Sequence, residues 1–264
     1  MTIMGMTAVI MLFVFLLGAS VFSFVNVLIY RVPKQLPFGN ERSFCPQCGQ
    51  ALKGYDMIPV FSYLLLGGKC RYCKCRISPR YPLIETLGGI LAVWSVYYFG
   101  QSEMYSGKSM GQAVLVFLLL ALLTAVTFVD IDTLEIPNGF VLAVLVLAVG
   151  AVFLFPEVKL WERGVGILCV SVPLALITLA VPGAFGGGDM KLMAALGAFL
   201  GWKLTVVAFF LAVLTGGGYG IYLLATRKKG RKEHFAFGPF LCVGAMLSIF
   251  WGADLMRWYF GFLQ

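Results

Sequence analysis

Long runs without any charged side chain dominate this sequence and restrict its fold more than any other feature. Of its residues, 60% are hydrophobic and 12% are charged, about half the charged fraction of an ordinary soluble domain. A helix that crosses the hydrocarbon of a bilayer needs about 20 apolar residues, and most of the runs approach or exceed that length. The sequence therefore predicts an all-α integral membrane protein. The runs free of Asp, Glu, Lys and Arg are 1–30, 86–102, 109–129, 136–156, 164–188, 192–202, 204–226 and 235–253.

Basic residues are concentrated in two segments, and this fixes the expected orientation. Nine of the 20 Lys and Arg lie from Arg31 to Arg80, and five more lie from Arg227 to Lys232. Cytoplasmic loops of membrane proteins carry such an excess, so both segments are expected to face the cytoplasm. The run 192–202 is short for a span, but the two clusters share a side only if it crosses. Eight transmembrane helices follow, with both termini outside.

The net charge of +8 does not indicate a nucleic-acid partner. The positive-inside rule accounts for both clusters, and no base-stacking aromatic residues on a recognisable module accompany them. Residues 1–30 lack the basic start of a secretory signal peptide, since the first charge is Arg31 after the run, so a retained first helix is expected.

Segment 31–82 has a different composition, rich in Cys, Pro and Gly, and carries two C-x2-C pairs, Cys45/Cys48 and Cys70/Cys73. A tetrahedral zinc ion needs four converging thiolates, and each C-x2-C turn presents two. Two disulfides are the alternative, but a cytoplasmic loop is kept reduced. The sequence therefore predicts a small zinc domain inserted between helices 1 and 2, in a division into 1–30, 31–82 and 83–264. Cys75 is an alternative ligand to Cys73.

Two aspartates lie where predicted helices end and begin on the cytoplasmic side. Asp130 ends the third helix, and Asp189 follows Gly186, Gly187 and Gly188 where the sixth begins. Two carboxyl groups brought close do not both ionise readily, so one can act as a base on water while the other keeps a proton. The pair can then hydrolyse a peptide bond, and the glycines leave room for an extended substrate. Lys191 is grouped with the glycines as a substrate-binding or supporting residue.

Simpler roles compete with this interpretation. Asp189 is well placed to cap the sixth helix, and Asp130 can be an ordinary interfacial residue. Asp132 and Glu135 compete with Asp130, although residues two apart on a helix point in different directions. Other protease classes are disfavoured, because His234 is the only histidine and no H-E-x-x-H motif is present.

Further motifs accompany the cysteine pairs and the two aspartates along nearly the whole chain. They are Ser23-Phe24-Val25-Asn26-Val27, Arg31-Val32-Pro33, Ile58-Pro59, Ser62-Tyr63, Arg80-Tyr81-Pro82-Leu83, Glu85, Gly186-x-Gly188-Asp189 and Phe237-Gly238-Pro239. With these residues, both cysteine pairs and Asp130, the chain resembles the type IV prepilin peptidases, also called prepilin leader peptidase/N-methyltransferases. Phe22 departs from the glycine expected before the Ser-Phe pair, a difference that concerns only local helix packing.

The resemblance implies a bacterial inner-membrane enzyme that cuts the basic leader from type IV prepilins or pilin-like proteins. Cleavage is expected after a glycine at the cytoplasmic face, with Asp130 and Asp189 as the catalytic pair. Many members then methylate the new N-terminus with S-adenosylmethionine. Two rivals are a preflagellin-type or signal-peptide-type aspartyl protease, which the tetracysteine insert disfavours, and a transporter with a carboxylate relay. The transporter would place its charges near the bilayer midplane.

Overall fold

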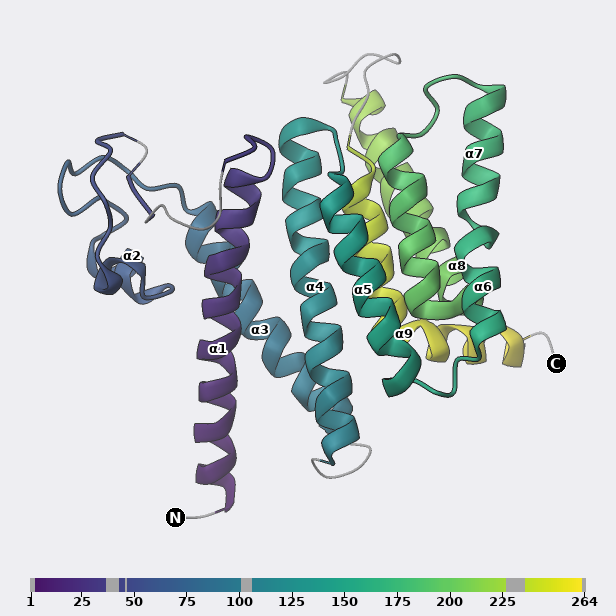
Figure 1. Ribbon diagram of the computed structural model, residues 1–264, viewed down its shortest axis with the longest axis horizontal. Coiled ribbons are helices and arrows are strands. Elements are labelled where there is room, and N and C mark those ends of the chain that lie inside the picture. The colour runs from purple at the N-terminus through teal and green to yellow at the C-terminus, as the bar shows by residue number, and fades with distance from the viewer. Residues whose placement is uncertain (1–2, 37–42, 46, 101–105, 227–235, 263–264) are drawn as a thin grey trace. The chain divides into compact units, whose positions relative to one another are not determined.

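The computed structural model describes residues 3–36, 43–45, 47–100, 106–226 and 236–262 (Figure 1). Helices dominate the described residues, which contain two isolated β-bridges and no strand. The basic cluster Arg227–Lys232 and the single histidine, His234, lie outside them. The helices are α1 (Ile3–Arg31), η1 (Gly54–Met57), α2 (Phe61–Leu65), α3 (Arg80–Gly100), α4 (Gly107–Thr133), α5 (Asn138–Leu154), α6 (Leu160–Cys169), α7 (Ser171–Ala180), α8 (Gly187–Ala225) and α9 (Gly238–Phe262).

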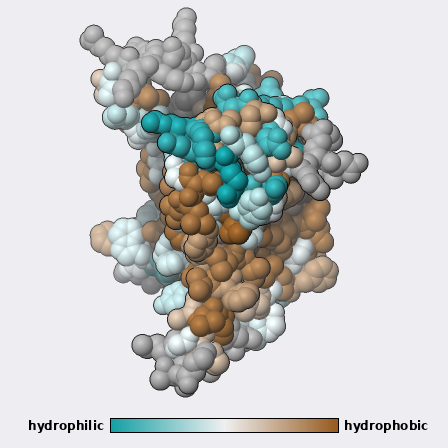
Figure 2. Space-filling view, turned by 90° about the vertical axis from the view of Figure 1, so that its left-hand side faces the viewer, coloured by the Kyte–Doolittle hydropathy of each residue, from teal (hydrophilic) through white to brown (hydrophobic). Residues whose placement is uncertain are grey.

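Six helical stretches in the described part of the chain are long and apolar enough to cross a membrane. They are α1, α3, α4, the combined α6 and α7, α8 and α9, and α5 is a shorter apolar helix. Figure 2 shows the corresponding surface, with hydrophobic side chains over much of it and hydrophilic ones gathered toward one end. An all-helical membrane protein is therefore confirmed, while the predicted eight spans exceed the six found by length and composition.

The difference in count arises at α5 and at α8, where the chain reverses. Gly201 inside α8 has φ 75° and ψ 166°, a backbone conformation that favours glycine. Phe185, just before α8, has its ring centroid 5.6 Å from that of Phe237. A Cβ on Gly216 would also lie 2.9 Å from the Phe237 ring. Phe237 therefore lies near both Phe185 and Gly216, which a straight helix would hold roughly 45 Å apart. The helix α8 thus doubles back into a first limb (187–200) and a second limb (202–225).

The helix expected from the run 164–188 is divided at Val170, between α6 and α7. Val170 has φ −111° and ψ −42°, and Pro173 follows in the first turn of α7. Proline has no N–H to donate to the carbonyl four residues earlier, so the hydrogen-bond ladder is interrupted here. The two helices together still form one stretch of spanning length, Leu160–Ala180.

The described chain forms two compact units, Met1–Phe117 and Leu118–Gln264. In the first unit, α1 packs closely on α3 because glycines receive large side chains. Phe22 is fully buried, and a Cβ on Gly88 would lie 2.1 Å from its ring. Its ring centroid also lies 5.7 Å from that of Phe117. The phenylalanine that departs from the expected glycine is thus accommodated by a glycine on the neighbouring helix.

In the second unit a buried arginine joins two helix ends. The Arg163 guanidinium donates to the carbonyls of Ala151 and Phe155 at the end of α5, at 2.8 and 3.0 Å. It also donates to Ala198 and Phe199 at the end of the first limb of α8, at 3.0 and 2.6 Å. Helix C-termini carry unpaired carbonyls and partial negative charge, so one cation satisfies both ends. This clamp fixes the limb whose other end carries Asp189.

Candidate functional site

Asp130 lies near the end of α4 and is buried, with 5% of its surface exposed. Its Oδ2 accepts a hydrogen bond from the backbone N–H of Gly238, at 3.0 Å. Gly238 is the first residue of α9 and is followed by Pro239, which suits the first turn of a helix. The unpaired N–H groups and positive dipole end of α9 therefore face the Asp130 carboxylate.

Asp189 lies in the first turn of α8 and is also buried, with 8% of its surface exposed. Its Oδ2 accepts a hydrogen bond from the backbone N–H of Gly186, at 3.2 Å. Asp189 is therefore not the N-cap residue that the sequence suggested, because it lies inside the helix and its side chain reaches back to the backbone of Gly186. It also lies close enough to Asp130 for the two charges to interact.

Ile136 forms the shared wall that brings the two aspartates together. A Cβ on Gly188 would lie 2.9 Å from the Ile136 side chain, and one on Gly238 would lie 3.3 Å from it. The starts of α8 and α9 thus both close on the loop that follows α4. The structure places Asp130 and Asp189 in one buried cluster although 58 residues separate them in the sequence.

The three glycines before and within the start of α8 differ in what surrounds them. A Cβ on Gly188 would meet Ile136, and one on Gly186 would lie 3.2 Å from the Asp189 carboxylate. Gly187 has open space, with nothing within 4 Å. Open space therefore lies beside Gly187, while Gly188 is small because Ile136 packs against it. Lys191 donates to Asn138 Oδ1 at 3.0 Å and links the start of α8 to that of α5.

The competing acids point elsewhere. Asp132 and Glu135 are exposed, in contrast to the buried Asp130. Sequence reasoning missed two neighbours of the pair. Gly238 was noticed only as part of Phe237-Gly238-Pro239. Cys242, a cysteine inside an apolar run, is buried near both aspartates and shares a hydrogen bond with Thr127.

The four predicted zinc ligands converge in the first unit. The sulfur atoms of Cys45, Cys48, Cys70 and Cys73 all lie within 4.8 Å of one another, so the cluster can hold a metal ion. Zn–S bonds of about 2.3 Å in a tetrahedron place sulfur atoms about 3.8 Å apart. The distance between the Cys45 and Cys73 sulfurs is 3.9 Å, which fits that geometry.

The two cysteine pairs sit in equivalent hairpins, which bears on Cys75. Cys45 N–H donates to Gln50 O at 3.0 Å, and Cys70 N–H donates to Cys75 O at 2.9 Å. The residues after each pair, Gly49 and Lys74, both have positive φ, of 69° and 59°. Cys75 therefore occupies the position of Gln50 and closes a hairpin with its backbone. Its sulfur lies 3.7 Å from that of Cys45, but it is outside the four-sulfur cluster.

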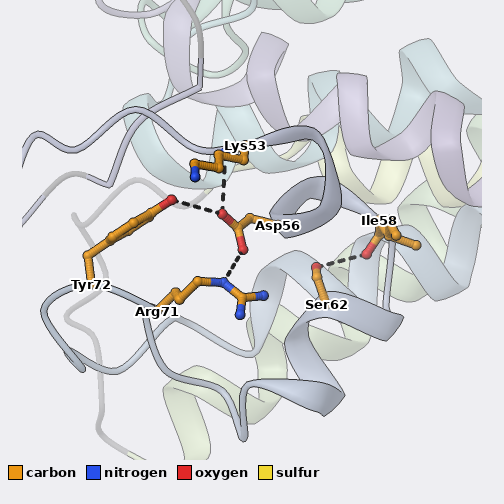
Figure 3. A network of polar contacts seen from close by, with 6 residues as sticks. All are labelled: Lys53, Asp56, Ile58, Ser62, Arg71 and Tyr72. Atoms are coloured by element: carbon orange, nitrogen blue, oxygen red, sulfur yellow. Dashed lines mark hydrogen bonds and ion pairs between the residues drawn. The ribbon is translucent and has the colours of Figure 1, made fainter.

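A polar network around Asp56 supports the same segment (Figure 3). Asp56 accepts hydrogen bonds from Arg71 Nε at 2.7 Å, from the Lys53 backbone at 3.3 Å and from the Tyr72 hydroxyl at 3.4 Å. Its side chain is only 2% exposed, and this burial acts to raise the Asp56 pKa. The hydrogen bonds outweigh burial, so the pKa of Asp56 lies below its ordinary value.

Two protein families match the chain, one in the N-terminal part and one in the C-terminal part. The family described as "Bacterial Peptidase A24 N-terminal domain" matches residues 16–99, and the "Type IV leader peptidase family" matches residues 116–221. A curated protein of Legionella pneumophila is 30% identical over 94% of this chain and 93% of its own length. The chain belongs to the type IV leader peptidase family.

Further relatives of this type IV leader peptidase family member share one name. The Legionella protein is called "Prepilin leader peptidase/N-methyltransferase", as are proteins of Aeromonas salmonicida and Pseudomonas aeruginosa. Each of these two is 31% identical to this chain; they cover 93% and 94% of it, respectively, and 92% of their own lengths. No solved structure gives a significant match.

Proposed function

We propose that the chain is a membrane aspartyl endopeptidase that cleaves the leader from type IV prepilins or pilin-like proteins. The proposed cut follows a glycine at the cytoplasmic face of the bacterial inner membrane. The observation that carries the proposal is the buried cluster in which Asp130 and Asp189 lie within electrostatic range. Buried ionisable groups in transmembrane helices are costly and mark functional sites.

The geometry allows one aspartate to act as a base while the other acts as an acid. Each carboxylate uses Oδ2 for a backbone N–H, from Gly238 or Gly186. Among the described residues Oδ1 of either aspartate has no hydrogen-bond partner. One carboxylate takes a proton from water, which attacks the peptide carbonyl, while the protonated partner donates to the carbonyl oxygen. The proton gained by the base then passes to the leaving amine, and the backbone N–H groups hold both carboxylates in place.

The family relatives support a second activity, methylation of the new N-terminus. S-adenosylmethionine supplies a methyl group on a sulfonium. The amine lone pair forms the new nitrogen–carbon bond, the carbon–sulfur bond breaks with its electrons left on sulfur, and one amine proton is released. We also propose that Cys45, Cys48, Cys70 and Cys73 hold a structural zinc ion, because four thiolates at this spacing suit zinc.

The proposed topology has eight crossings with both termini outside. The short apolar helix α5 and the reversal of α8 at Gly201 support this count, because they supply the two crossings beyond the six long stretches. Asp130 and Asp189 then lie on the same cytoplasmic side as the Cys-rich segment 31–82.

The proposal is tested by incubating the purified protein in detergent with a model prepilin. Mass spectrometry of the product should show a chain shortened by the leader, with its first residue following a glycine. With S-adenosylmethionine present, the new N-terminus should gain one methyl group. If the prepilin stays intact after incubation with folded wild-type protein, the peptidase assignment is overturned. A transporter with a carboxylate relay would then be favoured.

A further inference from the structure

A cavity of about 430 Å³ lies wholly within the first unit. Its walls come from the second half of α1, the Cys-rich segment and the start of α3, and the residues that line it fall between Ser23 and Glu85. This volume falls in the range of pockets that hold small ligands. The cavity belongs to the unit that contains neither Asp130 nor Asp189, so peptide hydrolysis does not account for it.

The cavity wall mixes charges of both signs with aromatic rings. Tyr30, Tyr63 and Tyr81 supply rings that can stack on a base or face a cation. Guanidinium groups bind carboxylates through paired hydrogen bonds, and carboxylates bind ammonium groups. A ligand that carries an anion, a cation and a flat aromatic system would use all three. The charged side chains that line the cavity are Arg31, Asp56, Arg71, Arg76 and Glu85.

Glu85 is the carboxylate in this wall that is held in place by hydrogen bonds and can still accept further ones. Its Oε2 accepts the Val60 N–H at 2.8 Å, and its carboxylate is also hydrogen-bonded by Ser23 of α1. A carboxylate has about four accepting positions, and these two donors leave the rest. Asp56, in contrast, already accepts from Arg71, Tyr72 and the Lys53 backbone.

The strained backbone at Val60 directs its N–H toward the Glu85 carboxylate. Val60 has φ 63° and ψ −50°, a conformation that β-branched residues rarely adopt. The Phe61 N–H bonds back to the Pro59 carbonyl at 2.6 Å, so Val60 is the centre of a γ-turn. Such strain costs about 1–3 kcal/mol and clusters at functional sites. Here the turn presents the Val60 N–H to Glu85 and fixes the carboxylate at the cavity wall.

We propose that this cavity binds S-adenosylmethionine, with Glu85 facing the positively charged methionine end of the molecule. The ligand's ammonium and sulfonium groups match a fixed carboxylate, its own carboxylate matches an arginine of the wall, and its adenine matches a tyrosine ring. The inference rests on the proposed methyltransferase activity and locates it in a unit separate from the proposed peptidase site.

The binding test uses full-length protein in detergent and radiolabelled S-adenosylhomocysteine, the reaction product, which binds without turnover. Glu85→Gln should weaken binding at least about tenfold, as expected for loss of a charged hydrogen-bond partner. Ser43→Trp, which introduces a large side chain at the cavity wall, should abolish it. Glu157→Gln, an exposed acid of the second unit, is the matched control and should bind like the wild type. Unchanged binding in both cavity variants, with zinc content intact, contradicts the proposal.

Ultraviolet crosslinking of radiolabelled S-adenosylmethionine gives a readout independent of activity and of any variant's folding. Labelled peptides should map between residues 23 and 85, and label confined to residues 118–264 overturns the cavity assignment. Methyl transfer to prepilin, measured in the same preparation, separates the two proposals. If methyl transfer occurs but the label lies outside the cavity, the methyltransferase proposal stands and the proposed binding site is wrong. Absence of both methyl transfer and binding in the wild type removes the methyltransferase function itself.

Discussion

Asp130 and Asp189 each receive a backbone N–H at the start of a helix, so asparagine can replace either with little change in shape. Asp130→Asn and Asp189→Asn should each abolish cleavage of a model prepilin, measured as initial rate, while expression and zinc content remain. General acid and base contributions are about 10²–10⁴-fold each, so the loss should reach several orders of magnitude. The double variant should be hardly slower than either single one, because the two groups act as a unit.

Asp132→Asn is the matched control for this series, because Asp132 is exposed and two residues from Asp130. It should retain most of the wild-type rate. An inactive Asp132→Asn beside an active Asp130→Asn would move the site to the other aspartate. Two active single variants would remove the aspartyl mechanism altogether.

Gly238 offers a second test at the residue scale. A Cβ on Gly238 would lie 2.6 Å from Asp130 Oδ2, a distance that real Cβ atoms do not tolerate. Gly238→Ala should therefore displace the Asp130 carboxylate and reduce the cleavage rate at least about a hundredfold, comparable to loss of a general acid or base. Gly139→Ala, also in the first turn of a helix but with nothing within 4 Å of its Cβ, should cleave at nearly the wild-type rate. Equal rates for the two variants would separate Gly238 from the site.

Asp56 gives the Cys-rich segment a defined pH dependence. Its pKa is lowered in the folded protein, so its stabilising contribution is present above the unfolded value of about 3.9 and is lost as the pH falls through the folded value. Asp56→Asn should make local opening of residues 47–78 roughly tenfold or more frequent at neutral pH, by amide hydrogen exchange. The difference from the wild type should shrink below about pH 4. A difference that stays constant with pH would exclude the ionised carboxylate as its cause.

At the scale of elements, the proposed zinc ion would join the two cysteine hairpins. Elemental analysis of the wild type should find one zinc ion per chain. Cys48→Ser should lose this ion and loosen the Cys-rich segment. Cys45 and Cys70 also line the cavity, so the same variant should lose S-adenosylhomocysteine binding. Cys75→Ser should keep the metal, because Cys75 stands in the hairpin position of Gln50. A fully active, metal-free wild type with two disulfides would contradict the zinc assignment.

The elements show which features a sequence can predict. Runs of apolar residues locate the helices, because burial in hydrocarbon demands them, and the spacing of the cysteines gives the cluster. The runs 192–202 and 204–226 also predicted two separate helices where α8 has two limbs. The break at Val170 was missed although Pro173 was visible, since proline also occurs within kinked membrane helices.

Contacts between distant segments were beyond reach of the sequence. The Gly238–Asp130 hydrogen bond joins residues 108 apart, and no spacing rule predicts it. Arg163 only precedes an apolar run in the sequence, and the structure is needed to show that it satisfies carbonyls of two other helices. The prediction that Asp130 and Asp189 form a pair rested on residue chemistry, topology and the family resemblance together. The support around the pair depends on packing that only three dimensions show.

For the molecule as a whole, the arrangement across the membrane is the property to be measured. Cysteines introduced at Arg42 and Gly230, both outside the described residues, should react with a membrane-impermeant thiol reagent only after cells are opened. Cysteines at Ser106 and Phe262 should react in intact cells, with the unmodified chain as background. This follows from the positive-inside rule and eight crossings. Labelling of position 230 from outside would mean that the first limb of α8 does not cross and would separate Asp189 from the cytoplasmic face.

The reversal at Gly201 also sets a depth. The first limb of α8 spans roughly 20 Å, about two thirds of a hydrocarbon core of about 30 Å. Beyond its turn, Trp202 and the Lys203–Glu162 ion pair, at 3.3 Å, are the kind of side chains that anchor at an interface. In the proposed topology the turn lies at the outer interface, and a limb this short then ends below the cytoplasmic one. The proposed peptidase site would therefore reach only bonds close to the end of a substrate's own apolar helix, and a polar spacer inserted between that helix and the bond should abolish cleavage.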